Sequence, residues 1–260
     1  MKQYIIDAFA DRVFRGNPTA VAVAEKQLPD KRLQEITGEN NLTETAFVVK
    51  SDTGYDLRFF TPYREIKFCG HAALAAAFLI LNRYEPDTDR IVFHSKAGEL
   101  AAGRSGDEVT LEFPAFKLRE IPITPLMTES LGARPERAYL DRDMLLVYRD
   151  EETVRRLAPD FEKMLRLDGL GVCVTAPAEK YDYVARFFVP KLRANEDPAT
   201  GSIHCMIGPY WSELLGKNEL TAYQASARGG TVRCRVADGR VTVAGRAVIF
   251  SEALLFLPEE

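Results

Sequence analysis

The chain has 260 residues, of which 46% are hydrophobic and 28% are charged, and its formal net charge is −4 at pH 7. This is the composition of an ordinary globular protein, with room for one large domain or two smaller ones. The negative charge argues against nucleic acid as a partner, because phosphate binding needs clustered Lys and Arg. The longest apolar run, Ala72–Leu81, has about half the length of a bilayer-spanning helix, so we expect no membrane partner.

The four cysteines are far apart in the sequence, and the first residues lack the pattern of a secretory signal. We therefore expect reduced thiols and a cytoplasmic protein. The three histidines and four cysteines show no metal-ligand spacing, so the sequence predicts no metal site.

Short segments rich in β-branched and aromatic residues predict many strands. In the first half these are Tyr4–Phe9, Ala20–Ala24, Thr45–Lys50, Tyr55–Phe60, Arg90–His94 and Val109–Phe113. In the second half they are Met144–Tyr148, Gly171–Ala176, Tyr183–Val189, Thr221–Ser226, Thr231–Val236, Arg240–Val243 and Ala253–Leu257. The Asp238-Gly239 pair predicts a tight hairpin turn between two of them.

Helices are expected in fewer places. Segments 29–37, 151–157 and 161–165 have the charged faces of surface helices. A helix that begins at Gly70 is apolar on every side and must be surrounded by protein. Its counterpart is Gly201–Leu215, which Pro209 should kink or break because proline lacks a backbone N–H.

The sequence contains an internal repeat. The segment Arg58–Pro62 reads Arg-Phe-Phe-Thr-Pro, and Arg186–Pro190, 128 positions later, reads Arg-Phe-Phe-Val-Pro. Cys69 follows the first segment and Asp197 the second, each seven residues past the proline and each before a stretch of small residues. A strand, a loop with an acid/base group and a helix N-terminus thus occur twice.

We therefore predict an α+β fold of two pseudo-symmetric lobes, each a barrel-like, mainly antiparallel sheet wrapped around a central helix. The lobes are expected at 1–116 and 117–251. The sequence leaves open whether a last strand, at about 252–260, returns to the first lobe. Two acid/base groups on opposite walls of a cleft would suit an enzyme that moves protons.

A helix N-terminus carries unpaired N–H groups and a partial positive charge, which favour an anion. Gly70 and Gly201 would let the backbone approach such an anion closely. The same field would lower the pKa of the Cys69 thiol. The alternative is that Cys69 is a small buried residue and His71 a capping side chain; the register match with Asp197 favours the functional interpretation.

The other candidates also allow two interpretations. Asp197 and Ser202 could cap a helix or contact a substrate, and no Gly-x-Ser-x-Gly pattern marks Ser202 as a nucleophile. Glu44 precedes a strongly apolar strand, where burial would raise its pKa toward that of a general acid/base, although such a glutamate is more often a solvated surface group. Asn17 could be an amide donor, but its spacing favours a turn.

Together these segments resemble the PhzF-like family, named for the phenazine-biosynthesis isomerase, and more distantly the diaminopimelate epimerases. The resemblance rests on the segments Asp7–Phe9, Gly16–Pro18, Glu44–Val48, Phe60–Pro62, Cys69–Ala72, Glu196–Ser202 and Gln224–Gly229. It implies the two-lobed diaminopimelate epimerase-like fold, a site between the lobes, and a homodimer.

The resemblance also implies a cofactor-independent isomerase that shifts a proton on a small carboxylate-bearing metabolite. Glu44 matches the family's general acid/base, and the positions of His71, Asp197 and Ser202 bind and protonate the substrate, with Gly70 in the same loop. We group Asn17, Cys69, Gly70, Gly201 and Ser202 as substrate-binding candidates.

Two alternatives remain open at this stage. The related epimerases use one cysteine on each lobe, and this chain has Cys69 and Asp197 instead, so an amino-acid racemase or epimerase would need an unequal pair. The second alternative is a non-catalytic small-molecule-binding protein that retains the fold.

Overall fold

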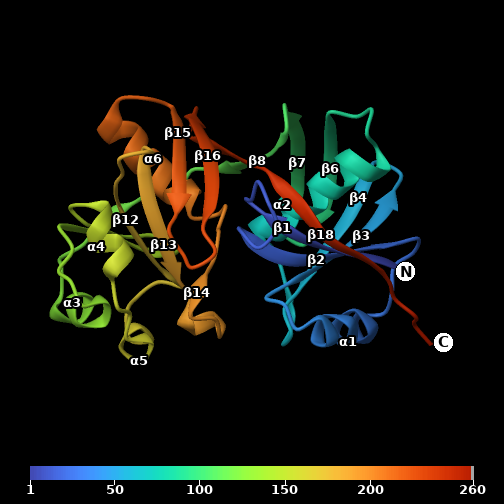
Figure 1. Cartoon of the computed structure of the whole chain (residues 1–260), viewed down its shortest axis with the longest axis horizontal. Helices are drawn as coiled ribbons and strands as arrows, with labels where there is room; N and C mark the ends of the chain where they lie inside the picture. Colours follow the sequence, from blue (N-terminus) through green and yellow to red (C-terminus); the bar gives the residue numbers. More distant parts are fainter. Residues whose placement is uncertain (259–260) are drawn as a thin grey trace. The chain divides into compact units, whose positions relative to one another are not determined.

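A computed structural model of the chain describes residues 1–258, and these divide into two compact units (Figure 1). The first unit contains Met1–Glu112 and the residues from Ala244 on, and the second contains Phe113–Val243. Within the described range, no helix has both the length and the apolar character needed to cross a membrane.

The first unit is built on a mixed, mainly antiparallel sheet. Its strands are β1 (Lys2–Ala8), β2 (Asn17–Ala24), β3 (Thr45–Ser51), β4 (Gly54–Phe60), β5 (Glu65–Ile66), β6 (Arg90–Ser95), β7 (Gly98–Ser105), β8 (Glu108–Pro114) and β18 (Ala247–Leu254). They pair in the order β18-β1-β2-β3-β4-β6-β7-β8, and only β2–β3 and β4–β6 are parallel. The short β5 pairs with the end of β4.

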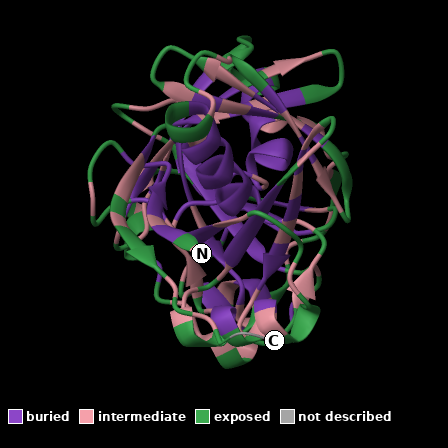
Figure 2. Ribbon diagram, turned by 90° about the vertical axis from the view of Figure 1, so that its right-hand side faces the viewer, coloured by how far each residue is buried: buried purple, intermediate pink, exposed green. Residues whose placement is uncertain are grey.

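One helix fills this unit, as predicted. Helix α2 (Gly70–Leu79) buries every residue except Phe78, and Figure 2 shows such buried ribbon in purple. It contacts β1, β2, β3, β7 and β18, and it continues into a π-helical turn, η1 (Ile80–Tyr84). Helix α1 (Asp30–Asn40) lies elsewhere on the sheet and buries Leu33 and Ile36.

The second unit repeats the strand order of the first. Its strands are β9 (Arg119–Glu120), β10 (Arg137–Leu140), β11 (Met144–Val147), β12 (Val172–Pro177), β13 (Tyr183–Phe188), β14 (Glu196–Asp197), β15 (Glu219–Gln224), β16 (Gly230–Ala237) and β17 (Arg240–Gly245). They pair in the order β9-β10-β11-β12-β13-β15-β16, with only β11–β12 and β13–β15 parallel. The short β14 pairs with the end of β13, as β5 does with β4.

Helices occupy matching places in the two units. Helix α6 (His204–Leu215) lies between β14 and β15 in the chain, as α2 lies between β5 and β6. The remaining helices are α3 (Pro125–Leu131), α4 (Glu151–Arg156), α5 (Phe161–Met164) and the 3₁₀ turn η2 (Pro190–Leu192). Two units with one strand order confirm the predicted fold class of pseudo-symmetric, mainly antiparallel lobes.

The break expected at Pro209 is not found, because α6 runs through this residue to Leu215. Proline cannot donate to the carbonyl four residues earlier, which belongs to Cys205. That carbonyl accepts a hydrogen bond from the Phe116 backbone N–H instead, at 2.8 Å. A neighbouring segment therefore supplies the missing donor, and the helix continues.

The last predicted strand is displaced in the structure. The sequence predicted it at about 252–260, whereas β18 spans Ala247–Leu254 and pairs with β1 along its whole length. Residues 259 and 260 of that prediction lie outside the described range. The register of the β1–β18 pair shifts between Ile5 and Ile6, and such an irregularity disturbs the alternation by which strands are recognised.

Candidate active site

Glu44 is held in place by its own backbone. It lies directly before β3, and its carbonyl accepts hydrogen bonds from the Thr19 hydroxyl at 3.0 Å and from the Ala20 N–H at 3.4 Å. Both donors belong to the neighbouring parallel strand β2. This anchoring fixes the point from which the Glu44 side chain extends, and that side chain is 18% exposed.

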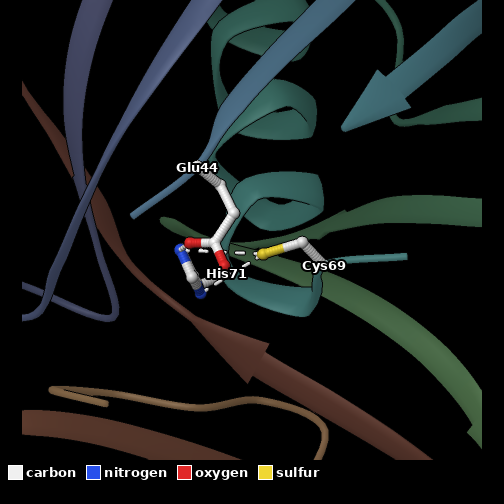
Figure 3. Close-up of side chains that lie close together, drawn as sticks. All are labelled: Glu44, Cys69 and His71. Atoms are coloured by element: carbon white, nitrogen blue, oxygen red, sulfur yellow. Dashed lines mark hydrogen bonds and ion pairs between the residues drawn. The ribbon is translucent and has the colours of Figure 1, made fainter. Parts of the chain in front are cut away.

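The start of α2 brings two further side chains to this carboxylate. Cys69 is the N-cap of the helix and His71 lies in its first turn (Figure 3). His71 Nε2 is 3.1 Å from Glu44 Oε2, and Cys69 Sγ is 3.5 Å from His71 Nδ1 and 3.7 Å from His71 Nε2. The fold thus joins three of the predicted residues in one cluster, although Glu44 is far from the other two in the sequence.

Glu44 and His71 form a largely buried ion pair. Burial is the largest single influence and would raise the pKa of the Glu44 carboxyl, but the interactions with His71 and Thr43 together outweigh it and lower the pKa below its usual value. Burial alone would lower the pKa of His71, but the neighbouring Cys69 and Glu44 raise it well above its usual value. The pair is therefore a carboxylate beside an imidazolium, each stabilising the charge of the other.

Two expectations about these pKa values were wrong. We expected apolar surroundings to raise the pKa of Glu44, and the contact with His71 has the opposite effect. We also expected the helix N-terminus to lower the pKa of Cys69. Burial raises the pKa of this thiol instead, and the nearby charge of Glu44 raises it further.

In the second unit, Asp197 lies at the start of a tightly bonded loop. The Thr200 hydroxyl donates to the Asp197 carboxylate, and Gln224 Nε2 donates to the Asp197 carbonyl. Gln224 Oε1 in turn accepts from the Thr200 N–H at 2.8 Å, and Ser226 Oγ donates to the Pro198 carbonyl at 2.7 Å. The motif that begins at Gln224 therefore serves to hold the loop of Asp197 in one conformation.

Sequence reasoning missed one residue of this loop's surroundings. Arg142 Nη2 donates to the Ser202 hydroxyl at 3.2 Å, and Arg142 Nε donates to the carboxylate of Asp143 at 2.8 Å. Asp143 is fully buried and also accepts from the Gly171 N–H at 3.0 Å, so it orients the guanidinium. The only signal in the sequence was Asp141-Arg142-Asp143, which is typical of a solvated turn.

The repeated Arg-Phe-Phe segments have a shared structural role. Arg58 bonds both carboxylate oxygens of Glu65 at 2.8 Å, and its guanidinium lies 5.1 Å from the centre of the Phe60 ring. Arg186 bonds both oxygens of Glu196 at 2.9 Å, and its guanidinium lies 4.8 Å from the centre of the Phe188 ring.

The strand pairing corrects the register of this repeat. Ile66 lies opposite Phe59, and Asp197 lies opposite Phe187. Asp197 therefore corresponds to Ile66 and not to Cys69, so the 128-residue match of Cys69 with Asp197 is wrong at this point. The extra residues between Arg186 and Glu196 cause the shift, because ten positions separate this pair and seven separate Arg58 from Glu65.

The remaining candidates lie in three different segments of the chain. Asn17 is fully buried at the first position of β2, opposite Ala8. Gly70 is the buried first residue of α2, and Gly201 is buried in the turn before α6, where its carbonyl accepts from the His204 N–H at 3.1 Å. Their roles in substrate binding stay predictions.

Comparison with known proteins gives consistent results. The family model described as phenazine biosynthesis-like protein, PhzC-PhzF, matches residues 6–253. An uncharacterized isomerase of Pseudomonas aeruginosa is 42% identical over 252 residues, which cover 97% of each chain. The crystal structure of a PhzF-family phenazine biosynthesis protein from Enterococcus faecalis superposes with a TM-score of 0.97 at 47% identity, covering 98% of this chain and 99% of that one.

A more distant likeness concerns the fold alone. A probable proline racemase from Agrobacterium radiobacter superposes with a TM-score of 0.63 at 9% identity, covering 99% of this chain and 93% of the racemase. The fold and the isomerase relatives together define this protein as an isomerase with an epimerase-like α+β fold. The chain belongs to the phenazine biosynthesis-like PhzC-PhzF family.

Proposed function

We propose that this isomerase shifts a proton between carbon atoms of a small carboxylate-bearing metabolite, without a cofactor, and that Glu44 is the general acid/base. The observation that carries the proposal is the buried pair of Glu44 and His71, whose facing atoms are 3.1 Å apart. Proton transfer from carbon needs a base that is ionised at working pH and sheltered from water. A carboxylate whose pKa is lowered by His71 is ionised.

The pair also provides a way to strengthen the base when substrate binds. In the free protein, His71 stabilises the Glu44 carboxylate, which makes it a weaker base. A substrate carboxylate or a developing enolate that interacts with His71 would compete with Glu44 for the imidazolium. The pKa of Glu44 would then rise, and its ability to take a proton from carbon would increase. His71 would at the same time stabilise the negative charge on the substrate.

Helix α2 favours the same charge distribution. Its first turn contains no acidic side chain, so its partial positive end is not neutralised there. Gly70 at this end places no side chain over the backbone. We assign the substrate's anionic group to this helix end, next to His71.

In the second unit we propose that Asp197 and Ser202 contact the substrate. The hydrogen bonds of Thr200 and Gln224 fix the Asp197 loop, and Arg142 adds a guanidinium beside the Ser202 hydroxyl. Arg142 and Ser202 together could bind a carboxylate oxygen.

The alternative of a racemase that uses Cys69 and Asp197 has less support. Burial and the charge of Glu44 raise the pKa of the Cys69 thiol, which opposes formation of the thiolate that such a mechanism needs. A non-catalytic binding protein is set aside because the relatives are isomerases.

The family also leads us to propose a homodimer, located in the cytoplasm, and sedimentation equilibrium tests the dimer.

Deuterium wash-in tests the proposal. Wild type, Glu44→Gln and the control Glu99→Gln, an exposed glutamate of β7, are incubated in D₂O with a panel of cyclic and amino-acid carboxylates. We expect carbon-bound deuterium with wild type and with Glu99→Gln, and a roughly 10²–10⁴-fold slower exchange with Glu44→Gln. Exchange that survives in Glu44→Gln but is lost in Cys69→Ser would overturn the assignment in favour of the racemase.

A further inference from the structure

Glu44, Cys69 and His71 are a thiol, an imidazole and a carboxylate that converge at one point (Figure 3). One ligand atom from each residue lies within 4.8 Å of the other two. Each of the three side chains is of a type that proteins use to bind zinc. The spacing of the residues in the sequence did not predict the cluster, because the start of β3 supplies one donor and the start of α2 supplies the other two.

Two of the three ligand–ligand distances are close to those of a tetrahedral centre. With a metal–sulfur bond of about 2.3 Å and metal–nitrogen and metal–oxygen bonds of about 2.0–2.1 Å, the sulfur–nitrogen edge is about 3.6 Å and the nitrogen–oxygen edge about 3.3 Å. Cys69 Sγ lies 3.7 Å from His71 Nε2, and the same nitrogen lies 3.1 Å from Glu44 Oε2. The sulfur also lies 3.5 Å from His71 Nδ1, so the imidazole ring must turn to direct its Nε2 lone pair at the ion.

A second observation points to a ligand at this place. Glu44 Oε2 is buried and accepts no hydrogen bond of good geometry within the described part of the chain. It faces His71 Nε2 as an ion pair only. A buried carboxylate oxygen usually accepts hydrogen bonds or binds a cation. The anchored backbone of Glu44 and the N-cap position of Cys69 hold the donors in place.

We propose that Glu44, Cys69 and His71 bind a borderline-soft divalent cation, with Zn²⁺ as the preferred ion. A thiolate and an imidazole favour such ions over Mg²⁺ and Ca²⁺, which prefer oxygen ligands. The three protein ligands leave the fourth tetrahedral position for water or an anion. On binding, the Cys69 thiol and the His71 imidazolium each release one proton to solvent, and no atom changes its oxidation state.

Occupancy of this site would block the reaction, and this part of the inference rests on the proposed function. The cation takes the carboxylate oxygen that accepts the proton and the imidazole nitrogen that faces it. Bound Zn²⁺ is therefore an inhibitor that a chelator removes, and Zn²⁺ availability would regulate the enzyme.

Titration with Co²⁺ tests the site without any need for a substrate. Co²⁺ occupies zinc sites and gives visible absorption in tetrahedral geometry and near-ultraviolet absorption when a thiolate is bound. The variants are His71→Gln, Cys69→Ser and His94→Gln, the last being a control at a partly exposed imidazole in β6. Circular dichroism confirms that each variant is folded.

We expect wild type and His94→Gln to bind one Co²⁺ with both absorption features, and Zn²⁺ to displace it. His71→Gln should bind at least about tenfold more weakly, since even outer partners of metal ligands change affinity by that factor. Cys69→Ser should lose the near-ultraviolet feature. Equal Co²⁺ binding by His71→Gln and His94→Gln, or a wild-type complex without the thiolate feature, would overturn the site.

A second readout separates the site from the reaction. If Co²⁺ binds as expected and Zn²⁺ slows wild-type deuterium exchange until a chelator is added, both the site and its inhibitory effect are supported. If Co²⁺ binds through Cys69 and exchange is unaffected, the site stands and the inhibitory role is refuted, while the Glu44→Gln variant decides separately whether Glu44 is the base.

Discussion

Replacement of Gln224 by Met would test whether this residue holds the loop that begins at Asp197. Gln224 is fully buried, and its amide bonds the Thr200 N–H and the Asp197 carbonyl. Met has nearly the same shape, so the change removes these two hydrogen bonds, and a third from Nε2 to the Thr200 hydroxyl, without leaving a cavity. A buried backbone group that loses its partner costs about 1–3 kcal/mol. Asp197 is only half-buried and can be hydrated, so we expect about 2–4 kcal/mol of destabilisation in total.

The chain offers a specific probe for this measurement. Its single tryptophan, Trp211, is buried in the second unit, so urea unfolding followed by its fluorescence reports the unit that contains Gln224. Lys180→Met, an exposed position of the same unit, is the control for the added methionine and should change the unfolding free energy by less than about 0.5 kcal/mol. If the unfolding free energy of Gln224→Met lies within about 0.5 kcal/mol of that of this control, the loop does not depend on the amide and the reasoning is refuted.

Three further predictions concern the first unit. The ion pair of Glu44 and His71 should stabilise the fold most between about pH 4.5 and 6.5. Below this window the stabilisation is lost because Glu44 is protonated as the pH falls through its lowered pKa. Above it the stabilisation is lost because His71 loses its proton as the pH rises through its raised pKa. The unfolding free energy of wild type minus that of the double variant Glu44→Gln, His71→Gln should therefore shrink toward pH 9, and a constant difference would contradict the pairing. Because its pKa is raised, Cys69 should react with iodoacetamide at pH 7.5 more slowly than glutathione does, as followed by intact mass; faster reaction would indicate a thiolate. Gly16→Ala should lower the free energy of unfolding by at least about 2 kcal/mol, because φ is +63° and the new Cβ would meet a carbonyl oxygen at 2.0 Å. The control Gly38→Ala, in open space on α1, should raise the free energy of unfolding by about 0.5–1 kcal/mol, and thermal unfolding measures both.

Local patterns predicted the strands that bury one or both faces, and missed those that depend on their neighbours. Strand β7 reads Gly-Glu-Leu-Ala-Ala-Gly-Arg-Ser, which has little β-propensity, and it is a strand because β6 and β8 pair with it. Helix α3 was missed although its signals were present. Thr124 caps it, Pro125 opens it, and Gly132 ends it with a positive φ.

The sequence predicted which residues form the site, but it did not predict the directions of their pKa shifts. Family motifs indicated Glu44, Cys69 and His71, but the sequence could not show that their side chains touch. Both pKa expectations considered one residue with its local surroundings, burial for Glu44 and the helix end for Cys69. The contact with His71 reverses the first, and burial of the thiol reverses the second. Arg142 was invisible for a related reason, since its orientation depends on a buried carboxylate beside it.

The internal repeat shows how a correct observation can carry an incorrect detail. The repeated Arg-Phe-Phe is explained by sheet chemistry, because in each unit the arginine covers a phenylalanine ring and bonds a glutamate on the short strand that follows. These contacts require the glutamate to lie on the short strand, opposite the arginine's strand. They place no limit on the length of the loop that joins the two strands. The loop is longer in the second unit, so counting positions from the arginine matched Cys69 with Asp197, whereas pairing matches Ile66 with Asp197. The repeat thus supports two related units, and it gives no reason to treat Cys69 and Asp197 as equivalent acid/base groups.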